Sequence, residues 1–208
     1  PSGLGSVKSI ATRQYHTCAI KADDSVQCWG SDSNGQSTVP VGLGSVKSVA
    51  AGSYHTCAIK ADDTVECWGQ DSTGQSTVPS GLGSVRSIAA GKDHTCAIKA
   101  DDSVECWGAD STGQSSVPAD LGTVSSISTG HKNTCAIKTV GTAQCWGNDY
   151  SGQSTVPADL GTVLQITTDG YYAGGPSHGH TCAIKANDSV QCWGSDYSGQ
   201  STVPADFQ

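Results

Sequence analysis

Short apolar runs recur along the whole chain, and each is bounded by Gly, Asp or Pro. The unit from Gly42 to Val78 shows the pattern clearly, with four extended segments. These are 45–50, 56–60, 65–68 and 75–78. Each run is about five residues long and rich in β-branched side chains, which is typical of strands joined by tight turns. The pattern predicts an all-β protein with four short antiparallel strands in each unit.

Both faces of such a sheet are apolar, because successive side chains point to opposite sides of a strand. The first face carries Cys57, Ile59, Val65 and Cys67, and the second carries Ala58 and Trp68. A sheet with two apolar faces is not stable alone, whereas stacking the units covers both faces and leaves only short edges. We therefore expect the units to pack as the blades of a β-propeller.

Cysteine positions fix the number of units. Cys18, Cys57, Cys96 and Cys135 are 39 residues apart, and Cys182 follows Cys135 after 47. In each unit a second Cys comes ten positions later and is followed by Trp-Gly. The chain is thus five repeats, and the last has an insertion. The approximate repeats are 1–40, 41–79, 80–118, 119–157 and 158–208.

Five repeats of this size predict one domain, 1–208, closed into a five-bladed β-propeller. Residues 204–207 restart the repeat at the phase in which residues 1–4 begin it. The two ends are therefore expected to meet at a closing seam.

The ten cysteines predict one disulfide within each blade, because the two cysteines of a repeat lie on neighbouring strands at equal distance from an acidic turn. The expected pairs are Cys18–Cys28, Cys57–Cys67, Cys96–Cys106, Cys135–Cys145 and Cys182–Cys192. Closing such a loop contributes about 3 kcal/mol in the chain-entropy model. A His-Cys-Cys zinc cluster is the alternative, but it lacks Cys-x-x-Cys spacing and the fourth repeat has Asn133 at the His position. Disulfides indicate a secreted protein.

The repeat also resembles that of the regulator of chromosome condensation family. The segments 55–59, 65–69 and 74–75 carry this resemblance, together with Gly52 and the acidic pair 62–63. The resemblance implies a β-propeller. It differs from typical members, which have seven longer blades, an Asp-Gly turn where this chain has Asp-Asp, and a nuclear nucleotide-exchange role at odds with paired cysteines. The resemblance therefore implies the fold and not that activity.

Charge and composition narrow the function. A formal net charge of −8 argues against nucleic-acid binding, which needs clustered Lys and Arg. No apolar run approaches the roughly 18 residues that a membrane span needs, so no membrane insertion is expected. No motif places a nucleophile beside a base, and we predict no catalytic residue, no metal ligand and no cofactor, with calcium left as an alternative.

The candidate site lies on loops. In an up-and-down blade, the loop after the first strand and the loop after the third strand lie on one face, which is where binding groups usually sit. Candidate ligand-binding residues there are Tyr15, Tyr54, Asp32, Asp71, Asp110, Asp149, Asp196, Tyr150, Tyr197, Tyr171 and Tyr172. The alternative is that the repeated Asp residues only stabilise their own turns.

These features favour a secreted, multivalent carbohydrate-binding protein, a lectin, with similar shallow sites on or between the blades and glycans or glycoproteins as partners. The alternative is a protein-binding or enzyme-inhibitory propeller that uses the variable loops and the Tyr171-Tyr172 insertion.

Overall fold

The computed structural model describes residues 3–170 and 178–207 of the 208-residue chain. It forms two compact units. The first is Pro1–Asp101 with Glu105–Ala109, and the second is Asp102–Val104 with Asp110–Gln208. The division of 1–208 as a single domain therefore stays a prediction.

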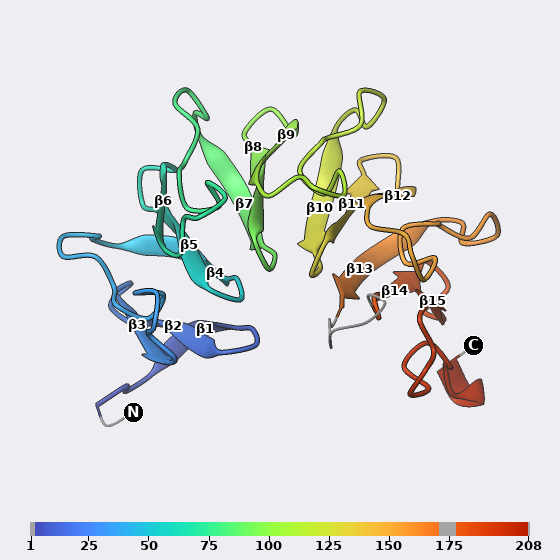
Figure 1. Ribbon diagram of the computed structural model, residues 1–208, viewed down its shortest axis with the longest axis horizontal. Coiled ribbons are helices and arrows are strands. Elements are labelled where there is room, and N and C mark those ends of the chain that lie inside the picture. Colours follow the sequence, from blue (N-terminus) through green and yellow to red (C-terminus); the bar gives the residue numbers. More distant parts are fainter. Residues whose placement is uncertain (1–2, 171–177, 208) are drawn as a thin grey trace. The chain divides into compact units, whose positions relative to one another are not determined.

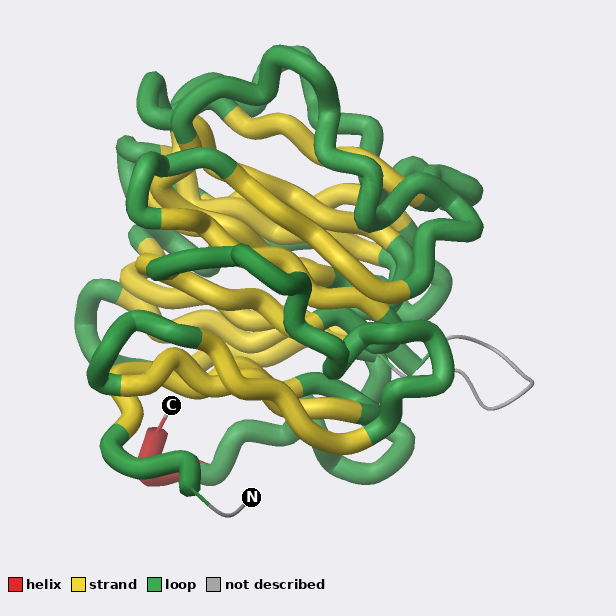
Figure 2. The backbone as a smooth tube through the Cα atoms, turned by 90° about the vertical axis from the view of Figure 1, so that its left-hand side faces the viewer, coloured by secondary structure: helices red, strands yellow, loops and turns green. Residues whose placement is uncertain are grey.

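Each repeat forms one three-stranded antiparallel sheet, with its strands in sequence order (Figure 1). The strands are β1 (Val7–Thr12), β2 (His16–Lys21), β3 (Val26–Gly30), β4 (Val46–Ala51), β5 (His55–Lys60), β6 (Val65–Gly69), β7 (Val85–Ala90), β8 (His94–Lys99), β9 (Val104–Gly108), β10 (Val124–Thr129), β11 (Asn133–Lys138), β12 (Ala143–Gly147), β13 (Val163–Asp169), β14 (His180–Lys185) and β15 (Val190–Gly194). A 3-10 turn, η1 (Ala205–Phe207), follows the last sheet. The view of the first repeats in Figure 2 shows their strands running between two sets of loops.

The expectation of four strands per repeat is wrong at the fourth segment. In the second repeat, the backbone N–H groups of Ser76 and Thr77 donate to Oδ1 of Asp71, at 2.8 and 2.9 Å. These groups are therefore not available to a strand ladder, and the segment is a compact turn. The same bonds recur at the corresponding positions of the other repeats.

The two predicted faces are confirmed in the second sheet. Cys57 and Ile59 pack against residues of the third repeat, among them Val85. Ala58 and Trp68 pack in a different cluster, with side chains of the first repeat. Each repeat thus contributes to the core on both of its sides, and burying one such Ile contributes about 1.5–3 kcal/mol.

A backbone carbonyl joins each repeat to the next. The Gln36 carbonyl, at the end of the first repeat, accepts hydrogen bonds from Thr56 Oγ1 at 2.8 Å and from Trp68 Nε1 at 3.1 Å. We call this three-residue arrangement the Gln clasp. It recurs as Gln75 with Thr95 and Trp107, Gln114 with Thr134 and Trp146, and Gln153 with Thr181 and Trp193.

The glycine of each Trp-Gly pair has a steric reason. Gly69 has a φ of 102°, and a Cβ at this position would lie 2.7 Å from the Tyr54 carbonyl oxygen. A side chain would clash with the loop that the third strand must approach. The acidic turns are strained in a similar way, because Asp63 adopts a φ of 67° in the position where the family typically has Gly.

All five predicted disulfides are present, and each joins directly opposed residues of the second and third strands. Since no cysteine is free, the sulfurs cannot ligate zinc, and the alternative His-Cys-Cys cluster is ruled out.

Candidate functional site

The loops after the first and third strands of a repeat lie together, as the strand directions predict. Ser31 N donates to the Tyr15 carbonyl at 2.8 Å, and Gln70 N donates to the Tyr54 carbonyl at 2.9 Å. We call this side of each repeat the loop face. All of the predicted binding residues that the structure describes lie on loops of this face.

The five repeated Asp residues hold their own loops. Asp32 Oδ1 accepts from the backbone N–H of Ser37 and of Thr38, and its Oδ2 accepts from Thr38 Oγ1. The hydrogen bond from the Thr38 hydroxyl is the main reason that the pKa of Asp32 lies below its usual value. Asp71, Asp110, Asp149 and Asp196 make the corresponding bonds. A ligand-binding role for these carboxylates stays a prediction.

The structure brings Tyr15 and Tyr54 together from the loops of two successive repeats. Their ring centroids are 5.0 Å apart with planes tilted by 31°, and Tyr54 OH donates to Tyr15 OH at 3.4 Å. This bond raises the pKa of Tyr54 to about 12, with smaller contributions from burial and from the nearby charge of Asp93. Tyr15 is 40% exposed. The pair forms an aromatic surface of fixed orientation.

Charged groups flank this aromatic surface. Asp93 occupies in the third repeat the position that Tyr54 has in the second, and its carboxylate lies 3.4 Å from Lys92 Nζ. The loop of Asp93 is fixed to the second repeat, because Thr73 Oγ1 donates to its carbonyl at 3.1 Å. The site thus combines two adjacent rings with a cation and an anion on a loop that is fixed in place.

The other tyrosines lie apart from this pair. Tyr150 is 72% exposed on the third-strand loop of the fourth repeat. Tyr197 lies on the corresponding loop of the fifth repeat, where its ring centroid is 5.5 Å from that of His178. Tyr171 and Tyr172 lie outside the described residues.

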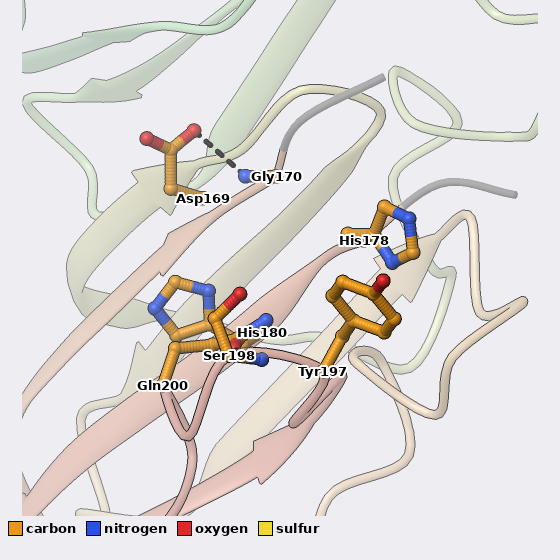
Figure 3. A pocket seen from close by; sticks show the side chains of 7 residues that line it. All are labelled: Asp169, Gly170, His178, His180, Tyr197, Ser198 and Gln200. Carbon is orange, nitrogen blue, oxygen red and sulfur yellow. Dashed lines mark hydrogen bonds between the residues drawn. The ribbon is translucent and has the colours of Figure 1, made fainter. Parts of the chain in front are cut away.

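The fifth repeat contains a pocket of about 570 Å³ beside its insertion (Figure 3). Its lining residues are Asp169, Gly170, His178, His180, Tyr197, Ser198 and Gln200. Asp169 accepts a hydrogen bond from Gly170 N at 2.8 Å, and His178 Nδ1 lies 3.4 Å from Ser195 Oγ. Within residues 3–170 and 178–207, no cluster of three His, Cys, Asp or Glu side chains could hold a metal ion.

Sequence reasoning identified Tyr15, Tyr54 and Tyr197 but missed Lys92, Asp93 and the histidines of the pocket. A signal for Lys92 and Asp93 was present, because they replace Ser53 and Tyr54 at equivalent positions of an otherwise constant repeat.

Family comparison places the repeat. The model of the "Regulator of chromosome condensation (RCC1) repeat" matches residues 7–36, 46–75, 85–114 and 177–200, together more than half of the chain. The chain belongs to this family. The fourth repeat, in which Asn133 replaces the His, is not among the matched RCC1 segments.

Solved structures with the RCC1-type fold are similar over nearly the whole chain. The ectodomain of the Physcomitrella patens receptor kinase CR4 has a TM-score of 0.73 and 25% identity, over 91% of this chain and 50% of that one. The ectodomain of the Arabidopsis thaliana receptor kinase ACR4 has a TM-score of 0.72 and 25% identity, over 92% and 73%. Yeast RCC1 (Prp20), solved bound to Kap60, has a TM-score of 0.76 and 17% identity, over 97% and 59%. The chain is thus an RCC1-type β-propeller protein of five blades, and it spans half the length of the CR4 ectodomain.

Comparison with curated proteins gave no match. In the described part of the chain, no helix has the length and apolar character needed to cross a membrane.

Proposed function

We propose that this protein is a secreted, non-enzymatic carbohydrate-binding protein whose sugar stacks on the Tyr15–Tyr54 pair. The observation that carries the proposal is the pairing itself, with two ring centroids 5.0 Å apart on the loop face. Sugar rings present apolar C–H faces edged by hydroxyl groups. They are bound by aromatic faces with hydrogen-bonding groups at the margin.

Lys92 and Asp93 are suited to the hydroxyl groups. The ammonium of Lys92 donates and the carboxylate of Asp93 accepts, so together they satisfy both roles of a sugar hydroxyl. Their mutual ion pair of 3.4 Å is partly exposed, and exchanging it for hydroxyl contacts costs little because such pairs are weak in water.

Localisation outside the cell is supported by two features. Five disulfides persist in oxidising compartments and are rare in the cytosol. The CR4 and ACR4 matches are ectodomains.

Multivalency by five equal sites is not supported at these loops. The position of Tyr15 and Tyr54 is taken by Asp93 in the third repeat and by Lys132 in the fourth. Among the residues that the structure describes, one tyrosine pair of this kind is present per chain. Avidity would therefore require several chains acting together.

A glycan array followed by titration calorimetry with the strongest ligand tests the proposal. Tyr15→Ala and Tyr54→Ala should each weaken binding more than about tenfold, because each removes half of the stacking surface. Tyr150→Ala is the matched control, since it removes an exposed tyrosine that stands apart from the pair, and should bind as the parent does. A silent array, or equal effects of all three substitutions, would contradict the proposal.

A protein partner is the second candidate, because yeast RCC1 (Prp20) was solved bound to Kap60 and a Prp20p structure was reported with its binding to Gsp1p and histones. Tyr is enriched in the energetic centres of such interfaces. A single protein bound 1:1, lost in Tyr15→Ala and unaffected by sugars, would favour this candidate. Deleting residues 171–177 would then test the predicted role of the insertion.

A further inference from the structure

Each repeat contacts the next through the same set of interactions. Between the first two repeats, Ile20 packs against Val46 and Val49, and the Gln clasp joins Gln36 to the second repeat. His16 Nε2 lies 2.7 Å from Thr56 Oγ1, and Val46 N donates to the Asp24 carbonyl at 3.0 Å. The backbone bond recurs as Val85 with Asp63, Val124 with Asp102 and Val163 with Gly141. A repeat therefore has a leading face, with the Ile, the His and the Gln carbonyl, and a receiving face, with two apolar β-branched residues, the Thr and the Trp.

The leading face of the fifth repeat is uncovered. Ile184 is 36% exposed, whereas the corresponding Ile of each other repeat is at most 2% exposed. Among residues 3–170 and 178–207, nothing hydrogen-bonds to the ring nitrogens of His180 or to the carbonyl of Gln200, although the corresponding Gln carbonyls each accept two bonds. His180 and Gln200 line the pocket of Figure 3. This pocket has the position at which other leading faces contact a following repeat.

The receiving face of the first repeat is uncovered as well. Val7 is 46% and Ile10 is 62% exposed, whereas their counterparts Val46 and Val49 are buried. Thr17 Oγ1 contacts only Thr12 Oγ1, at 3.2 Å, and within the described chain the Trp29 indole N–H has no acceptor. These are the donors and apolar groups that the leading face of the fifth repeat lacks.

We propose that this chain binds a second copy of itself head to tail, with the first repeat of one copy seated on the fifth repeat of the other. Thr17 and Trp29 of one copy donate to the Gln200 carbonyl of the other copy, and His180 donates to Thr17 as His16 does to Thr56. Val7 and Ile10 cover Ile184. The interface reproduces contacts that the structure already contains between successive repeats, including their burial and their hydrogen bonds.

Charge adds specificity at one end of this interface. Gly52 and Gly91 approach closely in the second and third repeats, where a Cβ on Gly52 would lie 2.8 Å from the Gly91 carbonyl oxygen. The register of the strands places Asp169 and Arg13 at the corresponding positions of the fifth and first repeats. Two long side chains widen that end of the interface, and their opposite charges bring attraction where the glycines bring close approach.

A contact between two different faces is heterologous, so each copy keeps one face of each kind and the assembly grows to a ring or a filament. Assembly would also place several Tyr15–Tyr54 pairs in one particle. The proposal does not depend on sugar binding, because none of its contacts uses those rings.

Light scattering coupled to size-exclusion chromatography, run over a range of protein concentrations, tests the proposal. The parent chain should show a mass that rises with concentration. Ile10→Glu removes the receiving face and Ile184→Glu removes the leading face, so each alone should be monomeric. A mixture of the two variants retains one intact interface per pair and should give a 1:1 dimer, and no larger species. Val140→Glu, at an exposed turn position away from both faces, is the control and should assemble as the parent does.

Each variant changes an exposed side chain, and circular dichroism should show unchanged folding. A parent chain that stays monomeric at every concentration overturns the proposal. So does a mixture of Ile10→Glu and Ile184→Glu that fails to dimerise, or a Val140→Glu chain that is monomeric. Loss of glycan binding without a change in assembly would count against the proposed function alone.

Discussion

The Gln clasp should make one buried hydroxyl group decisive for stability. Thr56 is fully buried, and its hydroxyl donates to the Gln36 carbonyl at 2.8 Å. A hydroxyl has one proton, so the 2.7 Å contact with His16 Nε2 must have the imidazole as donor. His16 is therefore neutral with its proton on Nε2, and burial accordingly lowers its pKa. Thr56→Val keeps the shape of the side chain and removes both bonds.

The cost can be worked out from these contacts. Losing the Thr56–Gln36 bond costs about 1 kcal/mol, and a buried His16 N–H left without an acceptor costs about 1–3 kcal/mol. The total is about 2–4 kcal/mol, of which the Trp68 bond to the same carbonyl recovers little, since it is already made. For a chain of this size, a loss near 3 kcal/mol lowers the melting temperature by about 6–12 °C.

Thermal unfolding followed by circular dichroism, with disulfides intact and at dilutions that keep the chain monomeric, measures this effect. Thr17→Val is the matched control, because Thr17 contacts only the Thr12 hydroxyl and should cost less than about 0.5 kcal/mol. Thr56→Ser keeps the hydroxyl and should lose only the methyl contribution of about 0.8 kcal/mol. The reasoning is refuted if Thr56→Val melts like the parent, or if Thr17→Val is as damaging as Thr56→Val.

Three further predictions follow from single contacts. Burial, the largest cause, and nearby cations lower the pKa of His55 from 6.5 to about 3, so the unfolded chain binds the proton first. Its contribution is complete above pH 6.5 and falls by about 2 kcal/mol between pH 7 and 5 in urea titrations. His55→Asn, the residue of the fourth repeat, should flatten this dependence. Replacing Cys57 and Cys67 together by Ser opens an 11-residue loop and should cost about 3 kcal/mol, measured as a lower urea midpoint. Absorbance at 295 nm should show Tyr54 ionising near pH 12, and Tyr15→Phe should lower that value because the accepting oxygen is gone.

The repeat pattern was sufficient to predict the sheets but not the whole of each repeat. Alternation along 56–60 and 65–68 correctly placed Ile59 and Trp68 on opposite faces, because strand periodicity is a property of the backbone. Segment 75–78 has the composition of a strand, yet the Asp71 carboxylate takes its N–H groups. Composition does not reveal which of two acceptors a backbone N–H will choose.

The site was harder to predict than the fold. Tyr15 and Tyr54 were singled out because they vary among constant repeats, but their contact depends on how two loops from different repeats approach each other. The Gln clasp was missed for another reason. Its acceptor is a backbone carbonyl, which every residue has, so only the recurrence of Gln36 and its counterparts in all five repeats hinted at a fixed role.

Near identity of the repeats connects the fold to the proposed assembly. A chain whose repeats share one leading and one receiving face always has one of each at its ends, and these two faces match as well as any internal pair does. Selection for a covered core therefore also produces a self-complementary surface. Arg13 and Asp169 are the residues that distinguish the terminal pairing from the internal ones, where both positions are glycine. If the terminal faces were meant only to be tolerated, like charges there would have been the simpler solution, because repulsion prevents association at little cost to the fold. Opposite charges instead favour the contact between the first and fifth repeats.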